Sequence, residues 1–274
     1  MSQLDEKGMS EKQYLAQYDP GEFTRPSVTV DIVVFTVTNV RGENYRKLPE
    51  KELRVLLIQR GGHPYIGHWA LPGGFVRPNE TVGEAANREL AEETGIQGGY
   101  LEQLYTFSKP ERDPRTWIIS CAHMALIDSD RLHLEAGSDA NDVQWFTVSM
   151  DNSLEIIKLS LLNGKTSLTA SVMPNTNGSE LKSIENNGLA FDHAEIVTCA
   201  LQRLRAKLEY TDLALCLMPE RFTLTELQQV YEAILGKSLF KAAFRRKMID
   251  IVQETDQYTS DKGHRPAKLY TQKT

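Results

Sequence analysis

The segment at residues 74–96, GFVRPNETVGEAANRELAEETGI, constrains the chain most, because it joins a well-bounded helix to a row of acidic side chains. Thr81 and Glu84 have the spacing of a capping box, and Gly95 is placed to end the helix in a left-handed conformation. Three glutamates at i, i+3 and i+4 share one helix face: Glu89, Glu92 and Glu93. Their mutual repulsion favours a bound cation, and carboxylate oxygens suit Mg²⁺ or Mn²⁺. A solvated acidic face is the commoner origin of such a pattern.

The same segment resembles the Nudix box, Gly-x5-Glu-x7-Arg-Glu-U-x-Glu-Glu-x-Gly-U, where U is apolar. Every defined position is filled, by Gly74, Glu80, Arg88, Glu89, Leu90, Glu92, Glu93, Gly95 and Ile96. The resemblance implies an α/β/α sandwich around a mixed sheet, and divalent-metal-dependent cleavage of a diphosphate joined to a nucleoside. It also implies that the catalytic glutamates Glu89, Glu92 and Glu93 bind the metal with the carbonyl of Gly73. Arg88 and Glu80 would form the orienting pair within the catalytic loop and helix.

Such a cleavage also needs a group that accepts a proton from the attacking water. Metal ions neutralise the diphosphate and lower the pKa of the bound water, and a carboxylate then takes its proton. In many Nudix enzymes this base lies on a later loop, which points to Glu135, Asp139 and Asp142. No spacing chooses among the three, and each alone is more commonly a surface carboxylate.

Residues around the box suggest a substrate. PYIGHWALPGGF and the RDPR sequence that starts at Arg112 resemble a branch of the family that acts on ADP-ribose, together with its regulatory relatives. Arg112 and Arg115 can hold phosphate or ribose hydroxyls by forked hydrogen bonds, although a tight turn with two exposed arginines is an equal alternative. Gly74 and Phe75 complete the expected substrate-binding set. Phe75 and Trp69 are candidates for stacking on adenine, but isolated aromatic residues near a loop more often pack in the core.

The remaining pattern predicts two domains. Strands are expected at 28–37, 53–59, 117–127 and 143–148, a hairpin around Asn163-Gly164 within 154–173, and a loop at 174–187. Asp192 is expected to cap a long helix, with Glu195 in capping-box position. The predicted Nudix domain covers 1–210, with an extended hairpin insertion near 151–187 and a linking helix at 193–210. The second domain covers 211–274.

Charge separates these two parts of the chain. From Arg221 to the end there are ten Lys and Arg against six Asp and Glu, a net charge of +4. The rest has 21 against 31, a net of −10, and the two sum to the whole-chain value of −6. A basic module could face nucleic acid, but chance and solvated faces explain the asymmetry equally well.

The C-terminal segment has the pattern of a winged helix-turn-helix. Thr223 and Glu226 have capping-box spacing, and Gly236 is placed to end the helix. A second helix, LFKAAFRRKMIDIV, would bury Phe240, Phe244, Met248 and Ile251, and a basic hairpin follows. The residues expected to contact DNA are Lys241, Arg245, Arg246, Lys262, Arg265 and Lys268. The alternative is a small dimerisation module with a solvated basic face.

Four further phrases, RPSVTVDIVVF, LAFDHAEIV, FRRKM and GHRPAKLY, resemble Nudix-related transcriptional regulators of NAD metabolism. In that family a Nudix effector domain senses ADP-ribose and a winged helix binds double-stranded operator DNA. Many such regulators have degenerate boxes, whereas this box is complete. Our preferred hypothesis is therefore a Mg²⁺-dependent hydrolase that cleaves ADP-ribose to AMP and ribose 5-phosphate and carries a DNA-binding module. The alternatives are an ADP-ribose-responsive regulator of NAD or sugar metabolism with little catalysis, and a Nudix enzyme whose C-terminal module only dimerises.

The cellular setting follows from what the sequence contains. No window of eighteen consecutive apolar residues is present and the N-terminus is polar, so neither a membrane span nor a secretory signal is expected. Cys121, Cys199 and Cys216 are odd in number and widely spaced, which favours the reducing cytoplasm over a disulfide framework. Paired half-sites on DNA make a homodimer the expected assembly.

Overall fold

The computed structural model describes residues 4–40, 49–95, 98–131, 140–164, 166–174, 181–259 and 266–273. The helices in chain order are α1 (Glu11–Gln17), η1 (Pro20–Glu22), α2 (Val82–Thr94), η2 (Ser129–Arg131), α3 (His193–Lys207), η3 (Leu213–Leu217), α4 (Leu224–Leu235) and α5 (Lys241–Met248). The strands are β1 (Ser27–Asn39), β2 (Lys51–Arg60), β3 (Trp69–Ala70), β4 (Gly73–Phe75), β5 (Tyr100–Phe107), β6 (Ile118–Leu126), β7 (Ala140–Asp151), β8 (Ile157–Asn163), β9 (Thr166–Pro174), β10 (Leu181–Asn187), β11 (Val252–Tyr258) and β12 (Lys268–Gln272).

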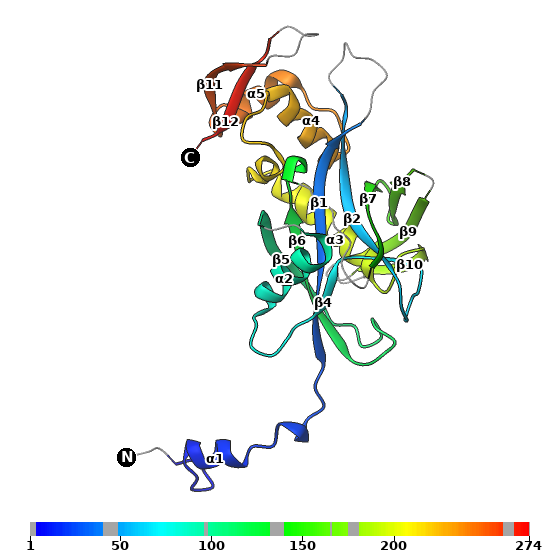
Figure 1. Ribbon diagram of the computed structural model, residues 1–274, viewed down its shortest axis with the longest axis vertical. Coiled ribbons are helices and arrows are strands. Elements are labelled where there is room, and N and C mark those ends of the chain that lie inside the picture. Colours follow the sequence, from blue (N-terminus) through cyan, green and yellow to red (C-terminus); the bar gives the residue numbers. More distant parts are fainter. Residues whose placement is uncertain are drawn as a thin grey trace.

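One large mixed sheet organises most of the chain. Its strand order is β10-β9-β8-β7-β2-β1-β6-β5, with β3 added beside β2 and β4 beside β1 (Figure 1). β1 and β6 pair in parallel, and the other pairs are antiparallel. The mixed sheet expected from the Nudix resemblance is therefore confirmed.

The central strand β1 explains why helices cover both faces of this sheet. Its run of β-branched residues is buried on both sides, as expected for a strand between two covering layers. Val33 and Phe35 join a core with residues of α3, whereas Ile32 and Val34 join a separate core with residues of α2. Successive strand residues point to opposite faces, so the two cores lie on opposite sides of the sheet. The predicted α/β/α sandwich is confirmed.

The extension beyond β7 differs in part from the sequence-based prediction. β8 and β9 form the expected hairpin, but Asn163 pairs with Thr166, so the turn is centred one residue later than Asn163-Gly164. Residues 181–187 were expected in a loop, and this prediction was wrong because they form β10, paired with β9. The polar composition of β10 suits an edge strand that leaves most of its side chains exposed, so backbone pairing decides its conformation.

The C-terminal module has the predicted helix, turn, helix and hairpin. Thr223 and Glu226 form the capping box of α4, and Gly236 ends the helix in the left-handed region with φ 69°. Phe244 and Met248 are buried on α5, but Phe240 is 88% exposed and only caps the helix, so its predicted burial was wrong. α5 ends at Met248, because the chain turns there toward β11 before Ile251 could extend the helical face.

This module is not packed separately from the sheet. Residues of α4, α5 and η3 belong to the same buried cluster as those of β1, β7 and α3. Figure 1 shows the module at one end of the molecule, and α1 at the opposite end on an extended N-terminal segment. Within the described ranges, no helix has both the length and the apolar character needed to cross a bilayer.

Candidate functional site

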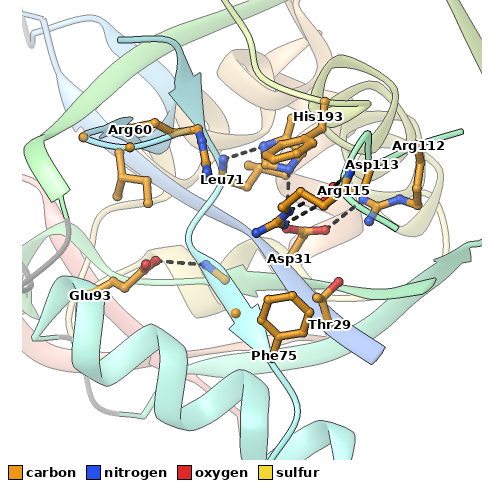
Figure 2. Close-up of a pocket in the computed structure, with 16 residues that line it drawn as sticks. Thr29, Asp31, Arg60, Leu71, Phe75, Glu93, Arg112, Asp113, Arg115 and His193 are labelled. Carbon is orange, nitrogen blue, oxygen red and sulfur yellow. Dashed lines mark hydrogen bonds and ion pairs between the residues drawn. The ribbon is translucent and has the colours of Figure 1, made fainter. Parts of the chain in front are cut away.

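A cavity of about 590 Å³ opens where β1, β2 and β4 meet the last turn of α2 and the start of α3 (Figure 2). The residues that line it come from six segments that are far apart in the sequence. They are Thr29, Asp31, Ile58, Arg60, Gly61, Gly62, Leu71, Gly73, Gly74, Phe75, Glu93, Arg112, Asp113, Arg115, Phe191 and His193. The cavity therefore includes part of the predicted box and the RDPR turn, together with residues that received no role from the sequence.

The two glycines before the box helix let that helix pack directly on β4. The backbone N–H of Gly73 donates to Glu93 Oε2 at 2.9 Å. A Cβ at Gly74 would lie 2.2 Å from Glu89 Oε1, and a Cβ at Gly73 would lie 2.1 Å from the carbonyl oxygen of Val30. A side chain at Gly73 would therefore collide with the backbone of β1, and one at Gly74 would displace the carboxylate of Glu89 on the helix.

Arg88 is the organising cation of the box. Its guanidinium donates to Glu80 at 2.7 and 2.9 Å, to Glu89 at 2.6 Å and to Glu92 at 3.1 Å. The hydrogen bonds from Arg88, aided by the backbone N–H of Arg77, lower the pKa of Glu80 to about 2. The same contacts, with Glu80 foremost, raise the pKa of Arg88. The orienting pair of Arg88 and Glu80 that the resemblance implied is thus present in the structure.

The three glutamates of the box have the hard oxygen donors that Mg²⁺ or Mn²⁺ prefers. However, Glu89 and Glu92 are both held by Arg88, and Arg77 adds a second ion pair to Glu92 at 3.2 Å. Across the described ranges, no three His, Cys, Asp or Glu side chains converge in a metal-binding arrangement. The side chains in this arrangement do not fit a bound metal. A metal ion could bind to the three glutamates only after Glu89 and Glu92 leave Arg88.

A buried polar network forms the opposite wall of the cavity. Asp31 accepts hydrogen bonds from Ser120 Oγ at 2.5 Å and from Arg112 Nη2 at 3.1 Å, and His193 Nε2 lies 3.4 Å from its other oxygen. His193 Nδ1 in turn accepts the N–H of Leu71 at 2.9 Å. Burial alone would raise the pKa of Asp31, but its interactions with His193, Arg112 and Ser120 lower it well below the ordinary range.

Arg112 lies in the cavity wall, but its guanidinium is committed to this network. The side chain is only 3% exposed and donates to Asp192 at 2.7 and 2.9 Å as well as to Asp31. This geometry suits a residue that positions the wall. Arg115 differs, because it is 42% exposed and pairs with Asp113 while its guanidinium carbon lies 5.5 Å from the centre of the Phe75 ring.

The two aromatic candidates for stacking on adenine differ in how exposed their rings are. Phe75 is 46% exposed at the cavity, so its ring is accessible for stacking. Trp69 is 7% exposed and packs edge-on against Phe146, with ring centroids 4.8 Å apart. The prediction that Trp69 stacks on adenine was wrong, because β3 inserts that ring into the core beneath the sheet.

The network also changes the expected cap of α3. Asp192 precedes the helix, but its side chain makes no capping hydrogen bond because both carboxylate oxygens accept from Arg112. Glu195 instead pairs with Lys109 at 2.8 Å and accepts the N–H of Ser183. The predicted capping box at Asp192 and Glu195 was therefore wrong, since tertiary partners use both carboxylates.

Four cavity residues carry functional geometry that the sequence reasoning missed: Asp31, Arg60, Phe191 and His193. The sequence contains a signal for three of these four residues. Asp31 is a lone acid within an apolar β-branched run, and Phe191 and His193 belong to the LAFDHAEIV phrase. A charged residue inside a buried strand needs a partner, so Asp31 could have been identified as part of a polar network.

Two of the three candidate bases, Glu135 and Asp139, lie outside the described residues. Asp142 lies on β7, where it pairs with Gln59 of β2 and accepts a hydrogen bond from Gln144. It is not among the residues that line the cavity. Asp142 therefore stays a prediction without geometric support in this arrangement.

Three of the six side chains predicted to contact DNA lie on α5. Lys241, Arg245 and Arg246 are all exposed there. Lys268 on β12 instead pairs with Glu254 of β11 at 2.9 Å. Lys262 and Arg265 lie outside the described residues. Of the four predicted DNA-contacting residues that the structure describes, three are therefore exposed cations on the second helix of the module.

Comparison with known proteins matches both parts of the chain. A model described as a NUDIX domain matches residues 26–153, and one described as the NrtR DNA-binding winged helix domain matches residues 214–271. The ADPR responsive transcriptional repressor NtrR of Acinetobacter baylyi is 36% identical over 265 residues, covering 95% of this chain and 88% of that protein. An ADP-ribose pyrophosphatase of Methanocaldococcus jannaschii is 42% identical over 100 residues, covering 36% of this chain and 58% of that protein.

A solved structure shows the same two-part arrangement. The crystal structure of Shewanella oneidensis NrtR complexed with a 27mer DNA matches with a TM-score of 0.63 and 30% sequence identity. The match covers 90% of this chain and 93% of that chain. Similarity of fold thus extends over most of both chains.

Proposed function

The chain belongs to the NrtR family, in which a Nudix domain is followed by a winged helix domain, and from this premise we propose that it is a transcription regulator controlled by ADP-ribose. Similarity to an ADPR responsive repressor over both domains is the observation that carries the proposal. It favours the regulator over our preferred sequence-based hypothesis of a hydrolase. We also infer that the protein acts in the cytoplasm as a homodimer, on operators near genes of NAD or sugar metabolism.

The geometry of the site supports ligand sensing. The cavity offers an accessible ring at Phe75 and a half-exposed guanidinium at Arg115, which suit a base and a phosphate. In the box, Arg88 pairs with Glu89 and Glu92 and offsets part of their negative charge in the absence of a metal ion. At the other end, Lys241, Arg245 and Arg246 are exposed and can meet DNA phosphates.

The test uses the full chain and DNA selected by that chain from a random duplex pool. Fluorescence anisotropy then measures affinity for the selected DNA with and without ADP-ribose. We expect salt-dependent binding to an inverted repeat that ADP-ribose weakens, whereas an equimolar mixture of AMP and ribose 5-phosphate has no such effect. Equal affinity for selected and random duplexes would contradict the proposal.

Hydrolysis is a second candidate, and the complete box is the observation that favours it. The partial similarity to an ADP-ribose pyrophosphatase supports the same candidate. In this candidate, Mg²⁺ or Mn²⁺ would be held by Glu89, Glu92, Glu93 and the Gly73 carbonyl once the contacts of Arg88 open. The assay follows AMP released from ADP-ribose with Mg²⁺, in the wild type and in Glu93→Gln. No turnover across a panel of nucleoside diphosphate derivatives would contradict hydrolysis and leave ligand sensing as the function.

A further inference from the structure

Arg60 is a cation in the cavity wall that lacks a carboxylate partner within the described ranges. It ends β2, and its Nε donates to the carbonyl oxygen of Pro64 at 2.8 Å. Among the described residues it takes part in no ion pair, whereas Arg112 and Arg115 in the same cavity are each paired with an aspartate. Its guanidinium therefore retains charge and hydrogen-bonding capacity that no carboxylate in the described part of the chain uses.

Phe191 brings this cation close to a second one. The guanidinium carbon of Arg60 lies 4.9 Å from the centre of the Phe191 ring, and that of Arg115 lies 5.7 Å from the same centre. Figure 2 shows Arg60 and Arg115 reaching the cavity from different segments of the chain. Each guanidinium is attracted to the ring, but the two repel one another.

The backbone at Phe191 is held in a conformation that its side chain disfavours. Its φ of 50° is in the left-handed region, which a bulky residue rarely occupies. Tyr65 packs against the ring at 4.7 Å between centroids, and His193 lies at 5.3 Å. Strain of this kind persists where the surroundings hold a residue in place for a function.

The electrostatics of Arg60 agree with a site that awaits an anion. Burial, followed by the neighbouring charge of Arg115, lowers the pKa of Arg60, and the charges of Asp113, Asp31 and Glu93 offset only part of this effect. A diphosphate has two anionic groups, so one molecule that contacts both guanidinium groups would offset this repulsion. Planar guanidinium groups suit phosphate oxygens, which they can contact in pairs.

We propose that Arg60 and Arg115, spaced by the Phe191 ring, form a two-arginine site that binds the diphosphate of the effector. The proposal rests on the proposed function, since it assumes a nucleoside diphosphate ligand. It assigns the diphosphate to the wall opposite the box helix, close to Phe75, whose ring is 5.5 Å from the Arg115 guanidinium. Arg60 and Phe191 thereby become ligand-binding and positioning residues, respectively.

The test compares ligands by titration calorimetry on the full chain. For Arg60→Gln we expect ADP-ribose and inorganic pyrophosphate to bind roughly 10- to 100-fold more weakly, the effect of losing hydrogen bonds to a charged group. Binding of adenosine should be unchanged, because it has no phosphate. Arg60→Lys should recover part of the loss, and Phe191→Leu should weaken diphosphate binding while Arg60 is still present.

Arg54→Gln is the matched control, because Arg54 lies on the same strand but pairs with Glu52 away from the cavity. It should bind every ligand as the wild type does. Wild-type affinity of Arg60→Gln for ADP-ribose and pyrophosphate would overturn the two-arginine site, as would a wild type that binds no diphosphate. If the wild type instead binds another nucleoside diphosphate but not ADP-ribose, and Arg60→Gln weakens it, the site stands and the proposed effector is wrong.

Discussion

Arg205 on α3 donates a hydrogen bond from its Nε to the carbonyl oxygen of Ile234 on α4, at 2.8 Å. At its other end α3 begins at His193, which Asp192 precedes. His193 contacts Asp31 and Asp192 pairs with Arg112, and both contacts lie in the wall of the cavity. One helix thus touches both the ligand site and the C-terminal module. A ligand that moves the start of α3 would also move a contact with α4.

Replacing Arg205 with methionine should weaken this connection. The carbonyl of Ile234 would lose its donor, so we expect the free energy of unfolding to fall by about 1–3 kcal/mol in urea denaturation. If α3 transmits the ligand signal, the ratio of DNA affinities without and with ADP-ribose should also move toward one. Affinity for ADP-ribose itself should remain as in the wild type, and an unchanged ratio would exclude this route.

Arg112→Met and Arg115→Met form a pair that separates a buried cation from an exposed one. Arg112→Met leaves Asp31 and Asp192 buried without their cation, and we expect a loss of about 3–5 kcal/mol in unfolding free energy. Arg115→Met removes a cation that is 42% exposed, but it leaves the buried carboxylate of Asp113 without that partner, so it should cost about 1–3 kcal/mol. Chemical denaturation measures both. Equal losses would contradict the positioning role assigned to Arg112.

The pairing of Arg88 with Glu80 should make the stability of the fold depend on pH in the acid range. The pKa of Glu80 falls from 4.5 to about 2 on folding, so its stabilising contribution is complete above pH 4.5 and is lost as the pH falls toward 2. Glu80→Gln cannot titrate, so its stability should change less over this interval than that of the wild type. Thermal melting between pH 5 and pH 2 compares the two, and parallel curves would exclude the predicted linkage.

Arg245→Ala should weaken DNA binding and reduce its dependence on salt. When a cation no longer neutralises a phosphate, the slope of log affinity against log salt becomes shallower by about 0.9. Lys158→Ala removes an exposed cation on β8, outside the C-terminal module, and serves as the control. Anisotropy titrations across a salt series give both slopes. Identical slopes for Arg245→Ala and wild type would place the DNA elsewhere on the protein.

The sequence predicted those elements whose signals are local. The box helix begins and ends as its caps indicate, because Thr81, Glu84 and Gly95 satisfy the helix ends through neighbouring backbone groups. β1 was predicted from a run rich in β-branched residues, and α4 from its own capping box. β5 and β10 were not predicted, since partly polar edge strands lack a clear apolar pattern and are fixed by backbone pairing with a neighbouring strand.

The contacts of the site fall into the same two groups, those that local sequence patterns predict and those that long-range contacts decide. Spacing put the three glutamates on one helix face, because a helix fixes which residues are neighbours, and the resemblance to the box paired Glu80 with Arg88. Tertiary structure decided that Arg112 belongs to a buried network with Asp31 and Asp192, and that Arg60 and Arg115 both lie against Phe191. These partners lie on different strands and loops, so no local pattern specifies them. The sequence by itself determined the family and the helix that defines it, whereas long-range packing decided which charges are paired and which remain available to a ligand.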